Sequence, residues 1–272
     1  MTPEDVSFVA EMVENLAGVI IRADRGFFIE TRLMSVARRE KVPGVTALLD
    51  QLRRSPDPGL ERQVVEATLM QETNFFRDRK VFSSLRKSIL PELATKGKGR
   101  LRILSAGCAT GQEAYSIAML AAEVVPESAL EIVALDFSGR QLEKAQSGLY
   151  SHFEVQRGLP IRRLLDNFDA VDDNWRVRPD LRQCIHWVEH NLLDDMSGFG
   201  EFELVMCRNV LGALTPAART RVSASLDLCC GMDGLLMVGA GESADLSAAF
   251  SPTGTPGVWR RSPAFARAAA QG

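Results

Sequence analysis

The residues best suited to chemistry lie in one short segment, where an apolar run ends in glycine and turns directly into a helical pattern. This segment is LRILSAGCATGQEAYS, from Leu101 to Ser116. Glycine lets a chain turn tightly and approach a ligand closely, and the start of a helix offers unpaired amide donors. The segment therefore predicts a nucleotide-binding loop around Gly107, although the full G-x-G-x-x-G spacing is missing. A plain tight turn between a strand and a helix would use one or two glycines as well.

An acidic residue ends the next apolar run, LEIVALD, at Asp136. Nucleotide-binding folds place an acid in this window, where it accepts hydrogen bonds from the ribose hydroxyls. The alternative is a helix cap, because Ser138, Gly139 and a helical stretch follow. One carboxylate can serve both roles.

The other reactive side chains form no recognisable catalytic or metal-binding set. None of the five cysteines belongs to a CxxC pair, and the chain has three histidines, so the spacing of zinc ligands is missing. We predict no metal site. We expect buried, reduced thiols at Cys108, Cys184, Cys207, Cys229 and Cys230.

Alternating apolar runs and helical patterns must position these residues. The apolar runs, which we predict to be strands, cover residues 100–107, 130–136, 201–209 and 234–241. Such alternation predicts β-α-β units and an α/β fold with a mainly parallel, Rossmann-like sheet. Between Tyr150 and Asn191 the alternation lapses into short pieces. A small antiparallel β insertion is therefore expected at about residues 150–190.

The start of the chain predicts an all-α N-terminal domain. Thr2 to Asp5 combines a capping hydroxyl, a first-turn proline and two acids. Further helices are predicted at residues 30–41, 45–54, 60–69 and 78–95. We divide the chain into a helical domain (1–77), a connecting helix and linker (78–99), an α/β domain (100–262) and a tail (263–272).

The bulk composition limits the possible partners. The chain has 272 residues, of which 46% are hydrophobic and 25% charged, and a net charge of −3, so nothing indicates a nucleic-acid partner. No stretch approaches the roughly 18 apolar residues that span a bilayer. The N-terminus, MTPEDVSF, is acidic where a signal peptide is basic. We expect a cytoplasmic, monomeric protein that does not insert into membranes.

Five blocks in order resemble the CheR family of chemotaxis methyltransferases. They are QETNFFRD, SAGCATGQEAYSIAM, ALDFS, HNLL and VMCRNVL. The family patterns are roughly TNET-x-FFR, SAGCSTGEEPYS, ATDIS, NLL and CRNVLIYF, and the likeness runs from about residue 5 to residue 262. The resemblance implies a class I methyltransferase sheet and S-adenosylmethionine as methyl donor, with S-adenosylhomocysteine as product. It also implies methyl ester formation on glutamate side chains of methyl-accepting chemotaxis receptors.

The resemblance also implies roles for single residues. Arg77 would be the catalytic residue that orients the acceptor carboxylate, while Glu113 would contact the amino-acid end of the cofactor and Asp136 its ribose. The implied cofactor-binding set is Gln71, Thr73, Arg77, Gly107, Glu113, Asp136, Asn191, Leu192, Arg208 and Asn209. Without the block order, Arg77 could equally be a surface ion-pair partner and Asn209 a turn residue. A glutamate nucleophile, whose ordinary pKa is about 4.3, is ionised at pH 7 and needs no general base.

Residues 22–41 carry more basic than acidic side chains in a chain that is acidic overall. In the family the N-terminal helices form a docking surface for the acidic helical region of receptors. We therefore expect Arg32, Arg38 and Arg39 to steer that partner. The alternative is a solvated helix face with local ion pairs. The β insertion resembles a subdomain that binds a receptor-tail peptide in some members.

Three departures from the family pattern keep other functions open. Gln71 replaces an asparagine, Ala213 replaces an aromatic residue whose hydroxyl lies near the transferred methyl, and GQEAYS keeps Glu113 but changes its neighbours. One alternative is a weakly active or inactive S-adenosylmethionine-binding homologue that acts as a sensor or scaffold. Another is a methyltransferase of the same fold with a different acceptor.

Overall fold

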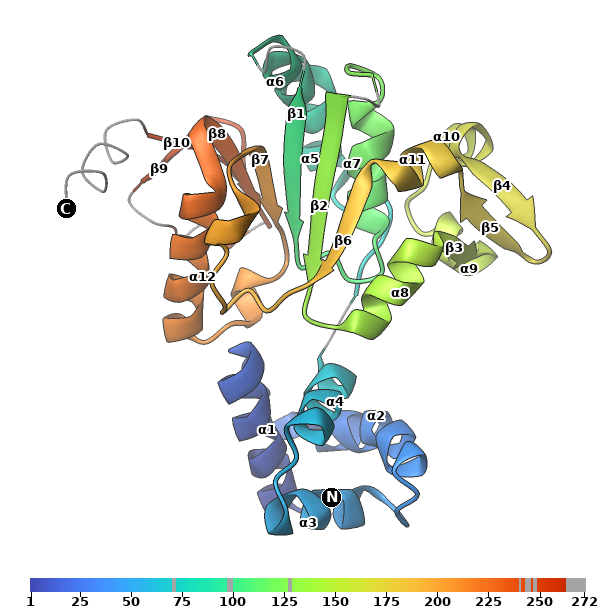
Figure 1. Cartoon of the computed structure of the whole chain (residues 1–272), viewed down its shortest axis with the longest axis vertical. Helices are drawn as coiled ribbons and strands as arrows, with labels where there is room; N and C mark the ends of the chain where they lie inside the picture. Colours follow the sequence, from blue (N-terminus) through green and yellow to red (C-terminus); the bar gives the residue numbers. More distant parts are fainter. Residues whose placement is uncertain are drawn as a thin grey trace. The chain divides into compact units, whose positions relative to one another are not determined.

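Figure 1 shows the computed structural model of the chain. It describes residues 1–69, 72–96, 100–126, 129–239, 241–242, 246 and 249–262. Contacts divide the chain into two compact units, Met1–Met70 with Ala213–Arg219 and Gln71–Gly212 with Thr220–Gly272. The domain boundaries drawn from the sequence at residues 77, 99 and 262 stay predictions. The predicted tail and Gln71 lie outside the described residues.

The first unit is a small assembly of helices. Its elements are α1 (Pro3–Ala17), the 3₁₀ turn η1 (Ala23–Arg25), α2 (Gly26–Arg39), α3 (Val45–Arg54) and α4 (Pro58–Thr68). The prediction for α3 is confirmed, whereas α2 begins at Gly26 rather than at residue 30. Glycine is a poor helix former, so the sequence pattern does not predict a helix beginning at Gly26.

The predicted capping signal at the start of α1 is confirmed. Thr2 Oγ1 accepts a hydrogen bond from the Asp5 amide at 3.1 Å, and the Asp5 carboxylate accepts one from the Thr2 amide at 2.9 Å. The same carboxylate is buried and receives Arg53 of α3 at 2.7 Å. The cap of one helix is therefore also an anchor for another.

The second unit is built on a seven-stranded sheet in the order β6-β2-β1-β7-β8-β10-β9. Its strands are β1 (Leu101–Ala106), β2 (Leu130–Asp136), β6 (Ile185–Glu189), β7 (Phe202–Cys207), β8 (Cys230–Val238), β9 (Phe250–Pro252) and β10 (Val258–Arg261). Neighbours from β6 to β8 pair in parallel, whereas β10 pairs antiparallel with both β8 and β9. The predicted α/β fold with a mainly parallel sheet is confirmed.

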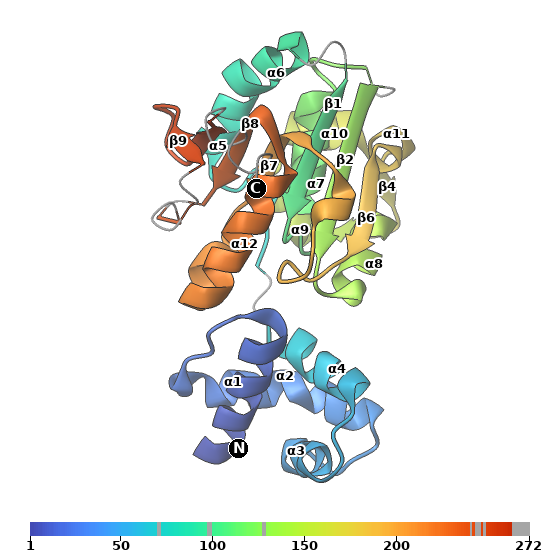
Figure 2. The same ribbon diagram turned by 60° about the vertical axis from the view of Figure 1, so that its left-hand side comes forward.

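Helices cover both faces of this sheet (Figures 1 and 2). They are α5 (Arg79–Ser84), the π-helical turn η2 (Leu85–Ile89), α6 (Leu90–Lys96), α7 (Gln112–Ala121), α8 (Gly139–Ser147) and α12 (Pro216–Cys229), with short 3₁₀ turns η4 (Ser197–Phe199) and η5 (Leu211–Ala213). Buried side chains of α7 and η2 share one core with β1 and β2, while α12 lies on the opposite face. The single helix predicted over 78–95 is interrupted by the π turn.

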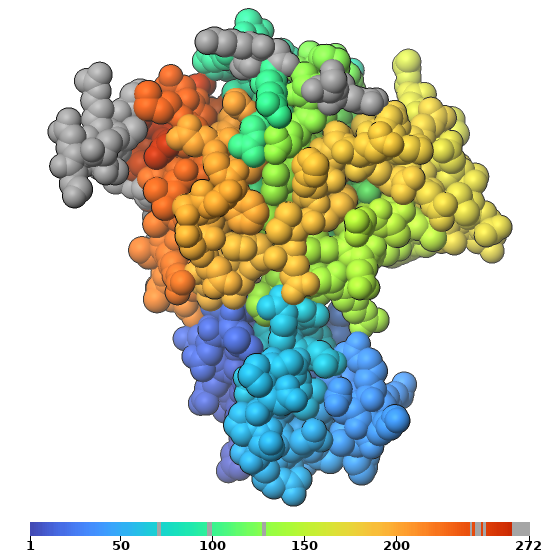
Figure 3. Space-filling view, in the orientation of Figure 1, coloured from blue at the N-terminus to red at the C-terminus, as the bar shows by residue number. Residues whose placement is uncertain are grey.

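The predicted antiparallel insertion is confirmed as a three-stranded sheet in the order β3-β5-β4. Its elements are β3 (Leu149–Ser151), α9 (His152–Gln156), α10 (Ile161–Asn167), β4 (Phe168–Val171), β5 (Asn174–Val177) and α11 (Pro179–Gln183). In Figure 3 the yellow part of this insertion stands out from the side of its unit. Phe75 anchors it, with its ring 5.0 Å from that of Tyr150 and 5.7 Å from that of Phe168.

The described residues can also be examined for membrane-spanning helices, metal clusters and free cysteines. No helix among them has both the length and the apolar character needed to cross a bilayer. They also contain no cluster of three or more histidine, cysteine or acidic side chains suited to a metal ion. All five cysteines are buried, as predicted.

Candidate cofactor site

The glycine loop between β1 and α7 is fixed by its neighbours on two sides. Gly107 and Gly111 adopt left-handed φ angles of 79° and 88°, which favour glycine. A Cβ atom at Gly107 would lie 2.6 Å from the Val210 side chain, and one at Gly111 would lie 2.8 Å from the Trp187 ring. The Gly107 amide donates to the Leu135 carbonyl at 2.8 Å, which ties the loop to the end of β2. Both the backbone angle and the available space require glycine here.

Asp136 holds two loops together at the end of β2. Its buried carboxylate accepts hydrogen bonds from the Ala109 amide at 2.8 Å and from the Ser138 amide at 3.0 Å. The residue that caps α8 is Ser138, whose side chain accepts from the Gln141 amide. Burial raises the pKa of Asp136, and these backbone hydrogen bonds oppose the rise. The helix-cap role weighed for Asp136 thus belongs to its neighbour.

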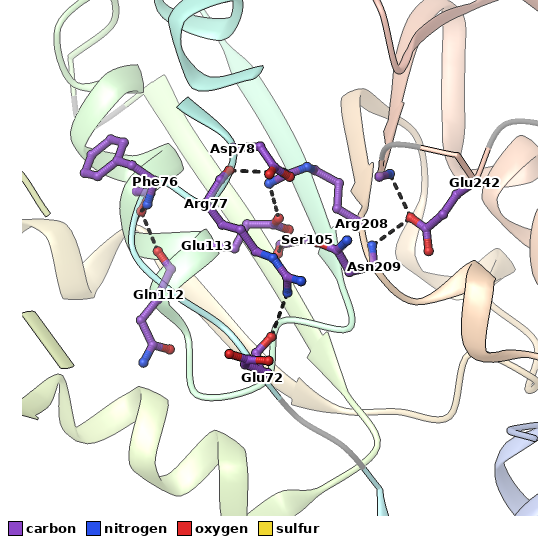
Figure 4. Close-up of polar contacts among 12 residues, drawn as sticks. Glu72, Phe76, Arg77, Asp78, Ser105, Gln112, Glu113, Arg208, Asn209 and Glu242 are labelled. Atoms are coloured by element: carbon purple, nitrogen blue, oxygen red, sulfur yellow. Dashed lines mark hydrogen bonds and ion pairs between the residues drawn. The ribbon is translucent and has the colours of Figure 1, made fainter. Parts of the chain in front are cut away.

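Glu113, in the first turn of α7, is largely buried and forms an ion pair with the buried Arg208, which follows β7. Arg208 Nη1 donates to the Glu113 carboxylate at 3.1 Å, and the Ser105 hydroxyl donates to its other oxygen at 3.0 Å. The Arg208 side chain is 1% exposed. Burial raises the pKa of Glu113, and the Arg208 charge is the main opposing influence. Figure 4 shows this group beside Arg77.

Arg208 also holds the turn that carries Arg77. Its Nη2 donates to the Arg77 carbonyl at 3.1 Å and to the Asp78 carboxylate. The residues on either side of Arg77, Phe76 and Asp78, have left-handed φ angles of 50° and 65°, which are strained for residues other than glycine. The Phe76 amide is bound by the Ser116 hydroxyl of α7 at 3.0 Å. These contacts hold the backbone around Arg77 in one uncommon conformation.

The Arg77 side chain is only partly buried. Its Nη1 donates to the Glu72 carbonyl at 2.8 Å (Figure 4). Its charge adds a small opposing influence to the rise in the pKa of Glu113 that burial causes. No acidic side chain in the described part of the chain forms an ion pair with Arg77. The alternative of a surface ion pair is therefore not what the structure shows.

Most of the remaining predicted residues lie at neighbouring strand ends. Asn191 and Leu192 lie just beyond β6, separated from it by His190. The His190 amide donates to the Asp136 carbonyl at 2.9 Å, which holds this segment beside β2. Asn209, with a left-handed φ of 60°, is exposed beyond β7. Thr73 is partly buried in the segment before Arg77. Open α/β sheets bind ligands at the carboxyl ends of their strands, where most of the predicted set lies.

Similarity to known proteins identifies the family. Residues 71–256 match the family described as "CheR methyltransferase, SAM binding domain". The chain is 30% identical over 239 residues to the chemotaxis protein methyltransferase Cher2 of Pseudomonas putida, a match that covers 85% of this chain and 87% of that protein. The chain belongs to the CheR methyltransferase family. It is thus an S-adenosylmethionine-dependent methyltransferase.

The chain is also similar to two methyltransferases of Pseudomonas aeruginosa, one named for chemotaxis and the other for biofilm formation. This CheR-family chain is 31% identical to chemotaxis protein methyltransferase 1 over 247 residues, covering 88% of this chain and 90% of that protein. It is 32% identical over 229 residues to a probable biofilm formation methyltransferase, WspC, covering 81% of this chain and 54% of that protein.

The site of this CheR protein fits S-adenosylmethionine. The cofactor is a cationic nucleoside, and the site provides two acids, the buried Asp136 at the end of β2 and the largely buried Glu113 in the first turn of α7. The glycine loop leaves no room for a Cβ at Gly107 or Gly111, so the backbone itself lines the turn. A nucleoside with a cationic tail requires acidic groups and a backbone that it can approach closely. The acids at the end of β2 and at the start of α7, together with the glycine loop, provide them.

Several residues that shape the site were missed in the sequence. Asp78 binds Arg208, and Ser105 binds Glu113 (Figure 4). Glu242 accepts hydrogen bonds from three backbone amides, those of Asn209, Gly212 and Gly239. Asp78 could have been found, because it directly follows Arg77 in the block QETNFFRD. Glu242 follows the glycines that end the fourth apolar run, which is a weak signal.

The residues predicted to bind a partner lie on α2 in the first unit. Arg32, Arg38 and Arg39 are all exposed, and the Arg32 guanidinium lies 4.9 Å from the centre of the Phe28 ring. Within the residues that the structure describes, none of the three forms an ion pair. Elsewhere in residues 22–41, Arg22 forms a local ion pair with Asp24 at 3.5 Å. The docking role of the three arginines stays a prediction.

Proposed function

We propose that this CheR-family protein forms methyl esters on glutamate side chains of chemoreceptors. The observation that supports this most is the setting of Arg77. Arg208 binds its carbonyl, its two neighbours have strained backbone angles, and the residue itself stays partly exposed. A guanidinium binds a carboxylate through two parallel hydrogen bonds and so fixes its direction. The names of these relatives, chemotaxis protein methyltransferases, agree with a role in chemotaxis.

The proposed chemistry asks for alignment rather than proton transfer. When bound, S-adenosylmethionine supplies an electrophilic methyl group on a positively charged sulfur. Arg77 would orient the ionised acceptor carboxylate, which needs no base. We assign Glu113 to the amino-acid end of the cofactor and Asp136 to its ribose.

Other residues complete the proposed cofactor site. Asn191 and Leu192 would bracket the adenine, because the segment after β6 is tied to the end of β2. We assign Thr73, Arg208 and Asn209 to the same pocket, with Arg208 acting through Glu113 and the Arg77 turn. These assignments follow the order of the matched blocks and stay proposals.

The proposed partner surface is the basic face of α2. Its exposed arginines would attract the acidic helices of a receptor, and such attraction raises the association rate most at low salt. Replacing Arg38 and Arg39 together by glutamate should lower the methylation rate at low ionic strength. An unchanged rate would contradict the docking role.

One observation favours a second function, a cofactor-binding homologue with little activity. Ala213 stands where the family has an aromatic hydroxyl, and the chain has two tyrosines. Both hydroxyls are in use elsewhere, since Tyr115 donates to the Ala145 carbonyl and Tyr150 to the Thr110 carbonyl. Neither can replace the missing group.

The test is methyl transfer from labelled S-adenosylmethionine to receptor-rich membranes, followed by release of base-labile label. We expect label with the wild type, loss of label with Arg77→Ala, and retention with the control Arg79→Ala, which removes an exposed neighbouring arginine. Binding of S-adenosylhomocysteine without any ester would support the second function instead.

A further inference from the structure

A carboxylate outside the matched blocks joins two strand ends next to the cofactor site. One oxygen of Glu242 accepts hydrogen bonds from the amides of Asn209 and Gly239, both at 2.7 Å (Figure 4). The other oxygen accepts one from the Gly212 amide at 2.9 Å. Asn209 and Gly212 follow β7, and Gly239 follows β8. Three backbone donors thus converge on one side chain.

The backbone around this carboxylate is shaped to receive it. Asn209 has a left-handed φ of 60°, which turns its amide out of the strand direction. A Cβ atom at Gly239 would collide with the Glu242 carboxylate and would lie 3.0 Å from the Asn209 amide. A larger residue at position 239 would exclude the acid. Hydrogen bonds from backbone amides to an ionised acceptor are among the stronger ones in proteins.

The segment that Glu242 holds lies directly against the glycine loop. Asn209 and Gly212 flank Val210, and the Val210 side chain occupies the space that a Cβ at Gly107 would need. On its other side Asn209 follows Arg208, which pairs with Glu113. Movement of the loop after β7 would therefore move both a wall of the glycine loop and the partner of a proposed cofactor residue.

We propose that Glu242 is a positioning residue of the cofactor site. Its charge holds the loop after β7. In that position Val210 supports the glycine loop, and Arg208 keeps Glu113 in its binding geometry. The inference rests on the proposed function of this site, because it assumes that the cofactor lies against these residues.

The experiment measures the dissociation constant of S-adenosylhomocysteine by calorimetry. In Glu242→Gln one oxygen becomes an amide N–H group that faces a backbone N–H, and we expect binding to weaken about tenfold, from the loss of one charge-assisted hydrogen bond. In Glu242→Ala the three amides lose their acceptor, and added formate, a small carboxylate, should recover part of the affinity. Formate should not change binding by the wild type.

The matched control is Asp227→Asn, which breaks a pair with Arg261 at 2.8 Å away from the strand ends of the site. It should lower the unfolding temperature and leave the affinity unchanged. Wild-type affinity in Glu242→Gln, or no effect of formate in Glu242→Ala, would overturn the proposal. Failure of the wild type to form esters would refute the proposed function without affecting this result, because the readout is affinity.

Discussion

Removing the buried Arg208 guanidinium is the perturbation whose effect follows most directly from the structure. Arg208→Met keeps an apolar side chain of similar length in a place that is 1% exposed. It leaves the largely buried Glu113 carboxylate with the Ser105 hydroxyl as its remaining hydrogen-bond donor among the described residues. It also frees the Arg77 carbonyl and the Asp78 carboxylate.

The size of the loss can be estimated from these contacts. Breaking a buried ion pair by removing one partner lowers the free energy of unfolding by about 3–5 kcal/mol. The Asp78 side chain is 47% exposed, so solvent screening limits its share to about 1 kcal/mol or less. We expect a total loss of about 4 kcal/mol, which is a large part of the roughly 5–15 kcal/mol that stabilises a typical domain.

The pH dependence of this loss has a definite sign. Burial already raises the pKa of Glu113, and loss of Arg208 removes the main opposing influence, so the pKa rises further. A carboxyl whose pKa is higher in the folded than in the unfolded state binds more protons when folded, so stability increases as the pH falls. The difference between wild type and Arg208→Met should therefore shrink in acid.

Urea unfolding of a double-mutant cycle tests this reasoning. Arg208→Met, Glu113→Gln and the double variant should show a coupling energy of about 1–3 kcal/mol, because neutral glutamine no longer needs the arginine. Additive losses in the cycle, or a loss in Arg208→Met that grows in acid, would refute the ion-pair account.

Three further predictions concern single residues. Gly107→Ala should lower cofactor affinity, and it should lower the free energy of unfolding by about 1–3 kcal/mol. The reason is that the new Cβ would lie 2.6 Å from Val210 at a φ of 79°. The control Gly198→Ala, where the Cβ meets open space, should match the wild type in calorimetry and urea unfolding. Because burial raises the pKa of Asp136, S-adenosylhomocysteine binding should weaken as the pH falls into the carboxyl range, and a titration of Asp136→Asn should show a flatter dependence. Burial acts to raise the pKa of Asp5, but hydrogen bonds from Thr2 and Arg53 outweigh it and hold the pKa below its usual range. Asp5→Asn should therefore lose about 2–3 kcal/mol in urea at pH 7, and the difference should vanish as the pH falls through the lowered pKa.

Sequence patterns predicted the framework of the site because that framework is periodic or local. Alternating runs indicated the parallel sheet, and the glycine loop and Asp136 mark the ends of β1 and β2. The predicted helix over 78–95 missed the π turn at Leu85–Ile89, because its apolar residues keep helical spacing through the turn.

The polar links of the site were not predictable in the same way. Arg208 is separated from Glu113 by 95 residues and from Asp78 by 130 residues. Such pairs depend on how the strand ends meet, and no local spacing encodes that. The left-handed φ angles of Phe76 and Asp78 are likewise imposed by contacts with α7 and with Arg208.

The most direct test of the central proposal is to locate the transferred methyl group. Receptor from a reaction with labelled S-adenosylmethionine would be digested, and its peptides mapped before and after mild base. Esterification predicts label on glutamate side chains of the cytoplasmic helical region, released by base and absent with Arg77→Ala. Base-stable label on lysine, arginine or another side chain, or no label from a protein that binds S-adenosylhomocysteine, would contradict it.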